Sequence, residues 1–356
     1  MSFFREFSEI ETRVESITDA GPLEKLLEVE REIIKQYQED ERFHRFSYAN
    51  DNEIYKAILQ STTDLIRNIS LSAELLQEYV YARQNSVGEN GKTRGGKPGL
   101  KPAFARGIFS AALLEILCTR TDDPIEINGN GKKFDYLFFH AKYARDVYVK
   151  NFKGDYIFAA LCCYGRNARN ITVSEIEGKA TLSHLGYNRG NVRNVIATKM
   201  KGSHTLYAAT NTTNLTLLGI QGDHTLHGVG SSDWENGVNF SKGLTNVSLA
   251  DISGRDILKD VGSGTNRYGS EWVMRLQEAQ PHEGREGIRN IITHLGETHF
   301  SRGGLRNHHF YQSLNQGRKE LFDRVILLAQ TIFDVPLAER SRVHDEIAQI
   351  NERIYS

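Results

Sequence analysis

Cysteine and long apolar runs are both scarce in this sequence. Only three cysteines occur among 356 residues, Cys118, Cys162 and Cys163, an odd number without paired spacing. This argues against a disulfide framework or a thiolate zinc site and predicts buried free thiols. No segment approaches the roughly 20 consecutive apolar residues of a membrane span, and the start, MSFFREFSEIETRVES, has acids where a signal peptide has basic and then apolar residues. We expect a cytoplasmic protein that makes no membrane contact.

The signatures of common catalytic sites are also missing. The GKT at Gly91–Thr93 resembles the end of a phosphate-binding loop, but Ser86 stands where that loop needs its first glycine. The histidines around His294 lack the zincin spacing. Glycan-cleaving sites need neighbouring carboxylates, whereas Asp155 and Asp223 lie three repeats apart in the pattern described next. We expect no enzyme, no metal and no small-molecule cofactor, with a carbohydrate-active enzyme as the last of three alternatives.

One pattern recurs through the middle of the chain: Asn, apolar, any, apolar, any, any, apolar, any, Gly. Four segments fit it and a fifth starts with Asp: Asn170–Gly178, Asn194–Gly202, Asn214–Gly222, Asn246–Gly254 and Asp146–Gly154. Successive glycines lie 24, 24, 20 and 32 residues apart. The strand core is therefore constant while one connection varies in length, which is typical of a solenoid.

The residue types predict parallel strands stacked coil upon coil. The first two apolar positions share one face of a strand, because side chains alternate with period two. Glycine permits a tight corner with positive φ, and Asn can bond the backbone there. Further apolar residues recur four and seven positions after each glycine, and Ile125–Gly129 half-fits as a first coil. The pattern resembles the parallel β-helix proteins, in particular uncharacterised solenoid proteins of archaeal type, and the resemblance implies a fold and not a function.

Helical patterns flank the repeats, so the predicted class is α+β. We expect a helical N-terminal region (1–119) with a basic Gly-rich loop (86–106), a parallel β-solenoid of at least five coils (120–265) and a helical C-terminal region (266–356). Helices are predicted over residues 22–43, 52–83, 103–118, 308–333 and 336–354. In the last helix Val343, Ile347, Ile350 and Ile354 form an apolar stripe. Such a stripe is typical of intramolecular packing, with a homodimer seam as the alternative.

Three arginines define a predicted basic edge of the solenoid. Arg145, Arg169 and Arg193 each precede the repeat Asp or Asn in successive coils. The lead-in loops add a second layer of cationic and aromatic residues: Tyr164, Arg166, Tyr187 and Arg189. Guanidinium groups stacked one coil apart repel each other, which favours an anionic partner such as a phosphate backbone. A solvated row of side chains is the alternative interpretation.

The overall charge of −1 hides a basic segment between residues 86 and 106. It contains Glu89 as its only acid, five glycines between residues 88 and 99, and five cations: Lys92, Arg94, Lys97, Lys101 and Arg106. A cationic loop of this kind can order on a structured RNA and follow its phosphates, or it can be a simple linker. His204 and His224 occupy one repeat position in adjacent coils and should stack as neutral imidazoles on the surface.

These features lead to a first hypothesis and a second from another class. The first is a non-enzymatic protein whose basic edge and basic loop bind RNA, on a ribonucleoprotein such as the ribosome. The second is a protein assembly scaffold that dimerises through its helical flanks. RNA binding would weaken steeply with salt, because it releases counterions, whereas an apolar dimer would not.

Overall fold

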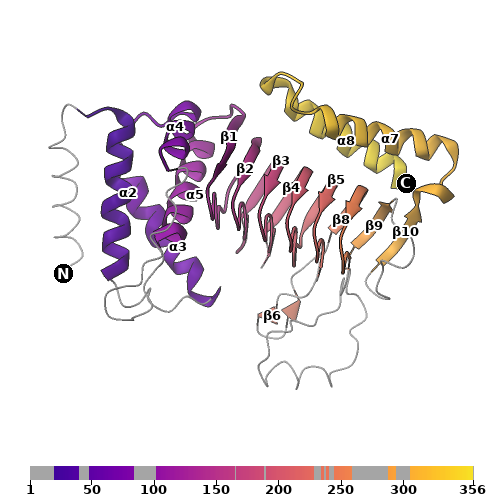
Figure 1. Cartoon of the computed structure of the whole chain (residues 1–356), viewed down its shortest axis with the longest axis horizontal. Helices are drawn as coiled ribbons and strands as arrows, with labels where there is room; N and C mark the ends of the chain where they lie inside the picture. The colour runs from indigo at the N-terminus through magenta and orange to yellow at the C-terminus, as the bar shows by residue number, and fades with distance from the viewer. Residues whose placement is uncertain are drawn as a thin grey trace, which may run out of the picture.

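A computed structural model shows an α+β protein whose centre is a parallel β-solenoid (Figure 1). It describes residues 20–39, 48–83, 102–164, 166–187, 190–227, 234–235, 238–239, 244–258, 288–293 and 305–355. The helices are α2 (Pro22–Glu39), α3 (Tyr48–Leu65), α4 (Ala73–Arg83), α5 (Pro102–Arg120), α7 (Gln316–Thr331) and α8 (Arg340–Tyr355), with short 3-10 turns η3 (Tyr311–Ser313) and η4 (Leu337–Glu339). The helix expected over residues 52–83 is two helices, because the chain turns between Ile66 and Ser72.

Eight strands form one parallel sheet that runs the length of the solenoid. They follow the order β1 (Ile125–Lys133), β2 (Val147–Lys153), β3 (Asn167–Glu177), β4 (Asn191–Lys201), β5 (Thr212–Gln221), β8 (Leu244–Ser253), β9 (Ile288–Thr293) and β10 (Leu305–Phe310). Two short strands, β6 (Trp234–Glu235) and β7 (Val238–Asn239), form a separate antiparallel pair. The predicted solenoid is confirmed. The sheet also continues beyond residue 265, so residues 266–356 contribute strands as well as helices.

The strand register aligns every copy of the repeat. Asn170 pairs with Asn194, Asn194 with Asn214, and Asn214 with Asn246. The imperfect first coil is also real, since Ile125 of β1 pairs with Val147 of β2. Inward-facing repeat residues such as Ile171 and Val195 are buried in a single continuous core.

The repeat asparagines form a buried hydrogen-bonded ladder. The Nδ2 of Asn194 donates to the Oδ1 of Asn170 at 2.7 Å, Asn214 donates to Asn194 at 2.9 Å, and Asn246 donates to Asn214 at 2.9 Å. Asn170 in turn donates to the carboxylate of Asp146 at 2.6 Å, which ends the ladder on a charged acceptor. Burying amides is costly unless they are bonded, so each rung depends on the coil before it.

The repeat glycines are required because adjacent coils approach closely at this corner. A Cβ at Gly178 would lie 1.8 Å from the carbonyl oxygen of Gly154, and a Cβ at Gly202 would lie 1.8 Å from that of Gly178. The predicted positive φ is present at Gly154, Gly202 and Gly254, at 149°, 146° and 141°, but not at Gly178 and Gly222. The close approach of the neighbouring backbone is thus a second reason for glycine at this corner, and the repeat pattern alone does not reveal it.

Opposite the sheet, each coil runs as overlapping turns that we call the turn face. The buried residue four positions after each glycine has φ between 51° and 56° and is at most 1% exposed: Phe158, Leu182, Leu206, Leu226 and Leu258. This left-handed backbone costs roughly 1–2 kcal/mol per residue when no glycine is present. Bonds to neighbouring coils offset the cost: the N–H of Leu206 donates to Thr181 O at 3.0 Å, and that of Leu226 donates to Thr205 O at 3.0 Å.

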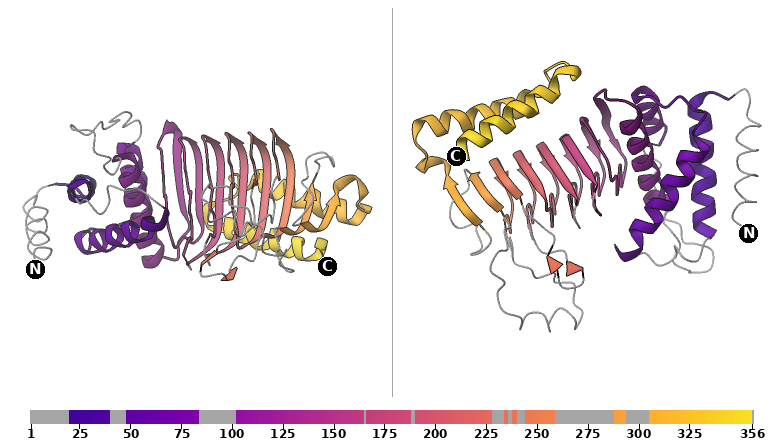
Figure 2. Two further views of the ribbon diagram at one scale, coloured as in Figure 1. Left: turned by 90° about the horizontal axis from the view of Figure 1, so that it is seen from below. Right: turned by 180° about the vertical axis from the view of Figure 1, so that it is seen from behind.

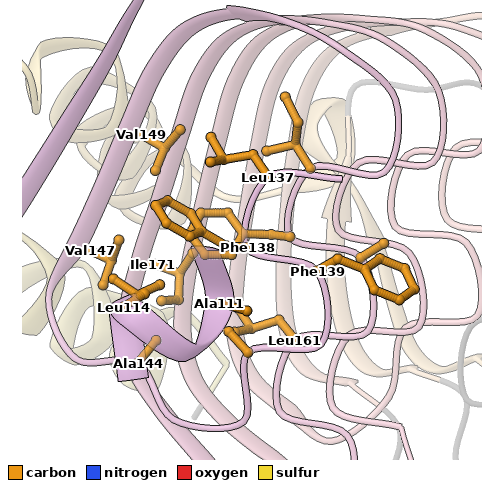
Figure 3. Packing of buried hydrophobic residues seen from close by; sticks show 14 of the residues in the cluster. Ala111, Leu114, Leu137, Phe138, Phe139, Ala144, Val147, Val149, Leu161 and Ile171 are labelled. Atoms are coloured by element: carbon orange, nitrogen blue, oxygen red, sulfur yellow. The ribbon is translucent and has the colours of Figure 1, made fainter. Parts of the chain in front are cut away.

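Helices α2 to α5 cover the β1 end of the stack, as Figures 1 and 2 show. Among the described helices, α5 alone is long and apolar enough to cross a membrane, and 78% of its apolar window is buried inside the protein. Its Ala111 and Leu114 point toward the same interior as Phe138 and Val147 of the first coils (Figure 3). Helix α5 is therefore the apolar lid on the open end of the solenoid core. The three cysteines are buried free thiols, as predicted.

Helices α7 and α8 lie along one side of the solenoid, against the sheet (Figures 1 and 2). The stripe of Val343, Ile347, Ile350 and Ile354 is at most 8% exposed and packs within a second cluster that contains Phe322 and Val325 of α7. The intramolecular interpretation of this stripe is confirmed. It is not an exposed seam for a second copy.

Replacing Gly202 by alanine tests the close approach of coils. We expect a loss of several kcal/mol in the free energy of unfolding, because the new Cβ meets backbone and no flexible side chain. Gly317→Ala in the first turn of α7 is the control, since its Cβ meets nothing closer than 3.8 Å. Urea unfolding of the two variants measures the difference. Equal stability of the two variants would contradict the stacking geometry.

Candidate nucleic-acid interface

The three arginines of the basic edge lie in successive coils as predicted, but each forms an ion pair with an acid of the same chain. Arg145 contacts Asp122 and donates to Thr121 O at 3.1 Å. Arg169 donates to Asp146 through Nε at 3.2 Å and through a second nitrogen, and Arg193 lies 3.8 Å from Asp345 of α8. The edge is therefore a set of ion pairs in this structure, not a free cationic row.

Arg106 of the predicted basic loop also has a structural role. It lies in α5, 3.7 Å from the fully buried carboxylate of Glu30, which Arg83 contacts and to which the Tyr79 hydroxyl donates at 2.9 Å. Burial raises the pKa of Glu30, while the two arginines and Tyr79 lower it. Lys92, Arg94, Lys97, Lys101 and Arg189 lie outside the described residues.

The remaining predicted residues, Tyr164, Arg166 and Tyr187, lie on the turn face near the helical cap. Arg166 is exposed, and both tyrosines are half-buried. Tyr164 adjoins Lys142, whose Nζ lies 5.7 Å from its ring centre and 5.0 Å from the ring centre of Tyr55 in α3. We call Lys56, Lys142, Arg166, Tyr55 and Tyr164 the junction cluster. The sequence analysis missed three of its members, Lys56, Lys142 and Tyr55.

Lys142 is a buried ammonium with a neutral hydrogen-bond partner. It is 5% exposed, and its Nζ contacts the Oδ1 of Asn52. Burial, then the charges of Lys56 and Arg166, lower the pKa of Lys142 to about 8, against a raising effect of Glu115. The Glu115 carboxylate is engaged by the Tyr55 hydroxyl at 2.5 Å. Three cations thus share a small region, and an added anion would be attracted there.

A row of rings continues from the junction cluster along the turn face. His140 stacks on Tyr164 at 6.3 Å between ring centres, His184 lies 5.6 Å from Tyr207, and His204 lies 4.7 Å from His224. His204 and His224 are adjacent as predicted, but their rings are tilted by 31° and not stacked. Burial lowers the pKa of His184 to about 4. In the described part of the chain, no group of three or more His, Cys, Asp or Glu residues could hold a metal ion.

The two acids considered for glycan cleavage accept hydrogen bonds from backbone N–H groups of the next coil. Asp155 accepts from the N–H of Lys179 at 2.8 Å, and Asp223 accepts from the N–H of Arg255 at 2.9 Å. Each carboxylate therefore joins one coil to the next. This geometry gives both acids a structural role.

Helix α8 crosses the sheet and covers part of the basic edge. Arg340 pairs with Glu126 of β1 at 2.5 Å, Ser341 accepts from Arg169 at 2.8 Å, and His344 bonds Thr172 of β3 at 2.9 Å. At its far end the Tyr355 hydroxyl donates to Val247 O of β8 at 2.8 Å. The helix thus spans the stack from the first coil to β8.

The fold and these surfaces define a parallel β-solenoid protein with a helical cap and a C-terminal helical hairpin. No family model, curated protein or solved structure matches the chain.

Acid should weaken the docking of α8 through His344. Burial lowers the pKa of His344 to about 3, against about 6.5 in the unfolded chain. The unfolded state therefore binds the extra proton, and stability present above pH 6.5 is lost as the pH falls toward 3, by roughly 1.4 kcal/mol per pH unit. Urea unfolding between pH 7 and pH 4 measures this slope.

The His344→Leu variant should have a smaller slope by about one proton, whatever its stability at pH 7. His224→Gln, altered on the turn face, is the matched control and should retain the slope. An unchanged slope in His344→Leu would show that His344 does not titrate in this way.

Proposed function

We propose that the protein is a non-enzymatic RNA-binding scaffold that holds RNA at the junction cluster and along the adjacent turn face. The partner we propose is a structured RNA in the cytoplasm, on a ribonucleoprotein such as the ribosome. We also infer kinship with solenoid proteins of archaeal type from the short coil. The proposal moves the contact from the basic edge, where each arginine is paired with an acid, to the junction cluster, where Lys56 pairs with Glu53 at 3.1 Å and Lys142 contacts the neutral Asn52.

The observation that carries the proposal is the meeting of three cations with tyrosine rings at one place. Lys142 lies over the rings of Tyr55 and Tyr164, and its pKa responds to the charges of Lys56 and Arg166. The exposed Lys56 and Arg166 suit phosphate oxygens and the half-buried ring of Tyr164 suits an unstacked base, whereas Tyr55 and Lys142 are buried. Cations for the backbone and rings for the bases are the two components of single-strand recognition.

The repetition of similar residues on successive coils also supports RNA binding. Adjacent coils are spaced by the strand separation, about 4.8 Å, so Tyr164 and Tyr187 recur at close intervals along the turn face. A loop of RNA can therefore meet several coils in succession. The predicted basic segment 86–106 runs into α5, which begins at Pro102 and places Phe104 5.7 Å from Tyr136 of the first coil between ring centres.

The second hypothesis, a homodimer through the helical flanks, relied mainly on the apolar stripe of α8, which is not exposed. The α8 stripe that would have formed the seam is buried within the protomer. A scaffold for other proteins remains compatible with the fold, but no described surface favours it as specifically as the junction cluster favours RNA.

Binding of a fluorescent RNA stem-loop to the purified chain tests the proposal. Affinity should fall steeply with salt, and Arg166→Gln should weaken binding severalfold and reduce the salt slope by about 1. Lys201→Gln, which removes an exposed cation at the far end of strand β4, is the control and should change binding little. Absence of binding in low salt, together with RNA-free protein from nuclease-free purification, would refute the proposal.

A further inference from the structure

The α7–α8 hairpin has its own apolar core and shares little of it with the solenoid. Its cluster contains Phe322, Val325, Ile347 and further residues of the two helices, and of the sheet side chains that the structure describes only Tyr148 and Ile196 join it. Most apolar side chains of the hairpin therefore pack within the hairpin. It can separate from the sheet as one unit, and two helices detached from the sheet are only marginally stable, so their amides exchange when it separates.

The rest of the contact between the hairpin and the sheet is polar and incompletely bonded. Within the described part of the chain, four buried atoms at this contact have no hydrogen-bond partner: Tyr148 Oη, Thr216 Oγ1, His344 Nδ1 and Asn351 Nδ2. They come from both sides, two from strands and two from α8. Burying polar groups without partners opposes docking, and opening would hydrate all four.

The hairpin also contacts two exposed arginines of the basic edge. Ser341 accepts from Arg169 at 2.8 Å, and Asp345 lies 3.8 Å from Arg193. The Arg193–Asp345 ion pair joins partly exposed side chains and is therefore weak, and Arg169 keeps its ion pair with Asp146 when Ser341 leaves. A hydroxyl and a carboxylate thus occupy positions where phosphate oxygens could bind guanidinium groups.

We propose that the α7–α8 hairpin is a strap that opens from the sheet, and that RNA phosphates replace Ser341 and Asp345 at Arg169 and Arg193. The exposed sheet face and the junction cluster would then contact one RNA from two sides of the solenoid. The RNA part of this inference rests on the function proposed above. The opening of the strap does not.

Hydrogen exchange of the full chain, followed by mass spectrometry, tests the opening directly. Amides of α7 and α8 should exchange together, at least tenfold faster than those of β3 to β5. Thr216→Val keeps the side-chain shape, removes one unbonded hydroxyl and should slow exchange of the hairpin while leaving β3 to β5 unchanged. Exchange of the hairpin at the same rate as the strands would overturn the strap, whether or not RNA binds.

RNA affinity of two α8 variants tests the competition. Asp345→Asn removes the contact to Arg193 and should strengthen stem-loop binding about threefold or more. Glu346→Gln removes the same charge from α8, but Glu346 pairs with Arg324 of α7 at 2.9 Å, so binding should stay near that of the unaltered chain. Equal gains in both variants would indicate net charge alone and overturn the competition. If the unaltered chain binds no RNA, the proposed function is wrong, and hydrogen exchange alone decides the strap.

Discussion

The close contact of adjacent coils at the glycine corner is the constraint on which the rest of this structure depends. The carbonyl of each corner lies where the side chain of the next corner would begin, as at Gly178 and Gly202. This approach sets the register that aligns the asparagine ladder, and the ladder ties Asp146 to Asn246 through four successive hydrogen bonds. The same register fixes the left-handed turns opposite the sheet, whose backbone would be unfavourable in an isolated coil.

The two surfaces of functional interest follow from that stacking. Residues before the repeat Asn fall in one row and become the basic edge, which α8 and acids of the chain neutralise. The turns that follow each strand fall on the turn face. There Tyr164 and Arg166 lie near Lys142 of the preceding coil. The cap supplies Tyr55 and Lys56 from α3. The junction cluster therefore exists only because the helical cap and the first coils are assembled in this register.

The repeat pattern was enough to predict the fold of the centre, because each copy carries the same apolar, Asn and Gly positions. Strands β9 and β10 were not predicted because their segments lack the repeat glycine, and each breaks the apolar pattern once, at Thr293 in β9 and at His308 in β10. Their Arg-Asn pairs, Arg289 with Asn290 and Arg306 with Asn307, were a signal that could have found them, since both asparagines lie in register with the ladder column.

The candidate site was only partly predictable from the residues. Tyr164, Arg166 and Tyr187 stand out in the lead-in loops, but Lys142 lies outside the repeat pattern, and its neighbours Tyr55 and Lys56 are far away in the chain. The ion pairs of the basic edge join Arg193 to Asp345 across more than a hundred residues, so only the folded structure shows that this arginine is occupied.

Ultraviolet cross-linking of bound RNA, with identification of the attached peptides by mass spectrometry, tests the central claim that the stacked coils and the cap create an RNA site together. The account predicts cross-links on peptides that contain Tyr164 and Tyr187, and on the α3 segment around the exposed Lys56. Cross-links confined to the outer side of the α7–α8 hairpin, or to the far end of the solenoid, would contradict it.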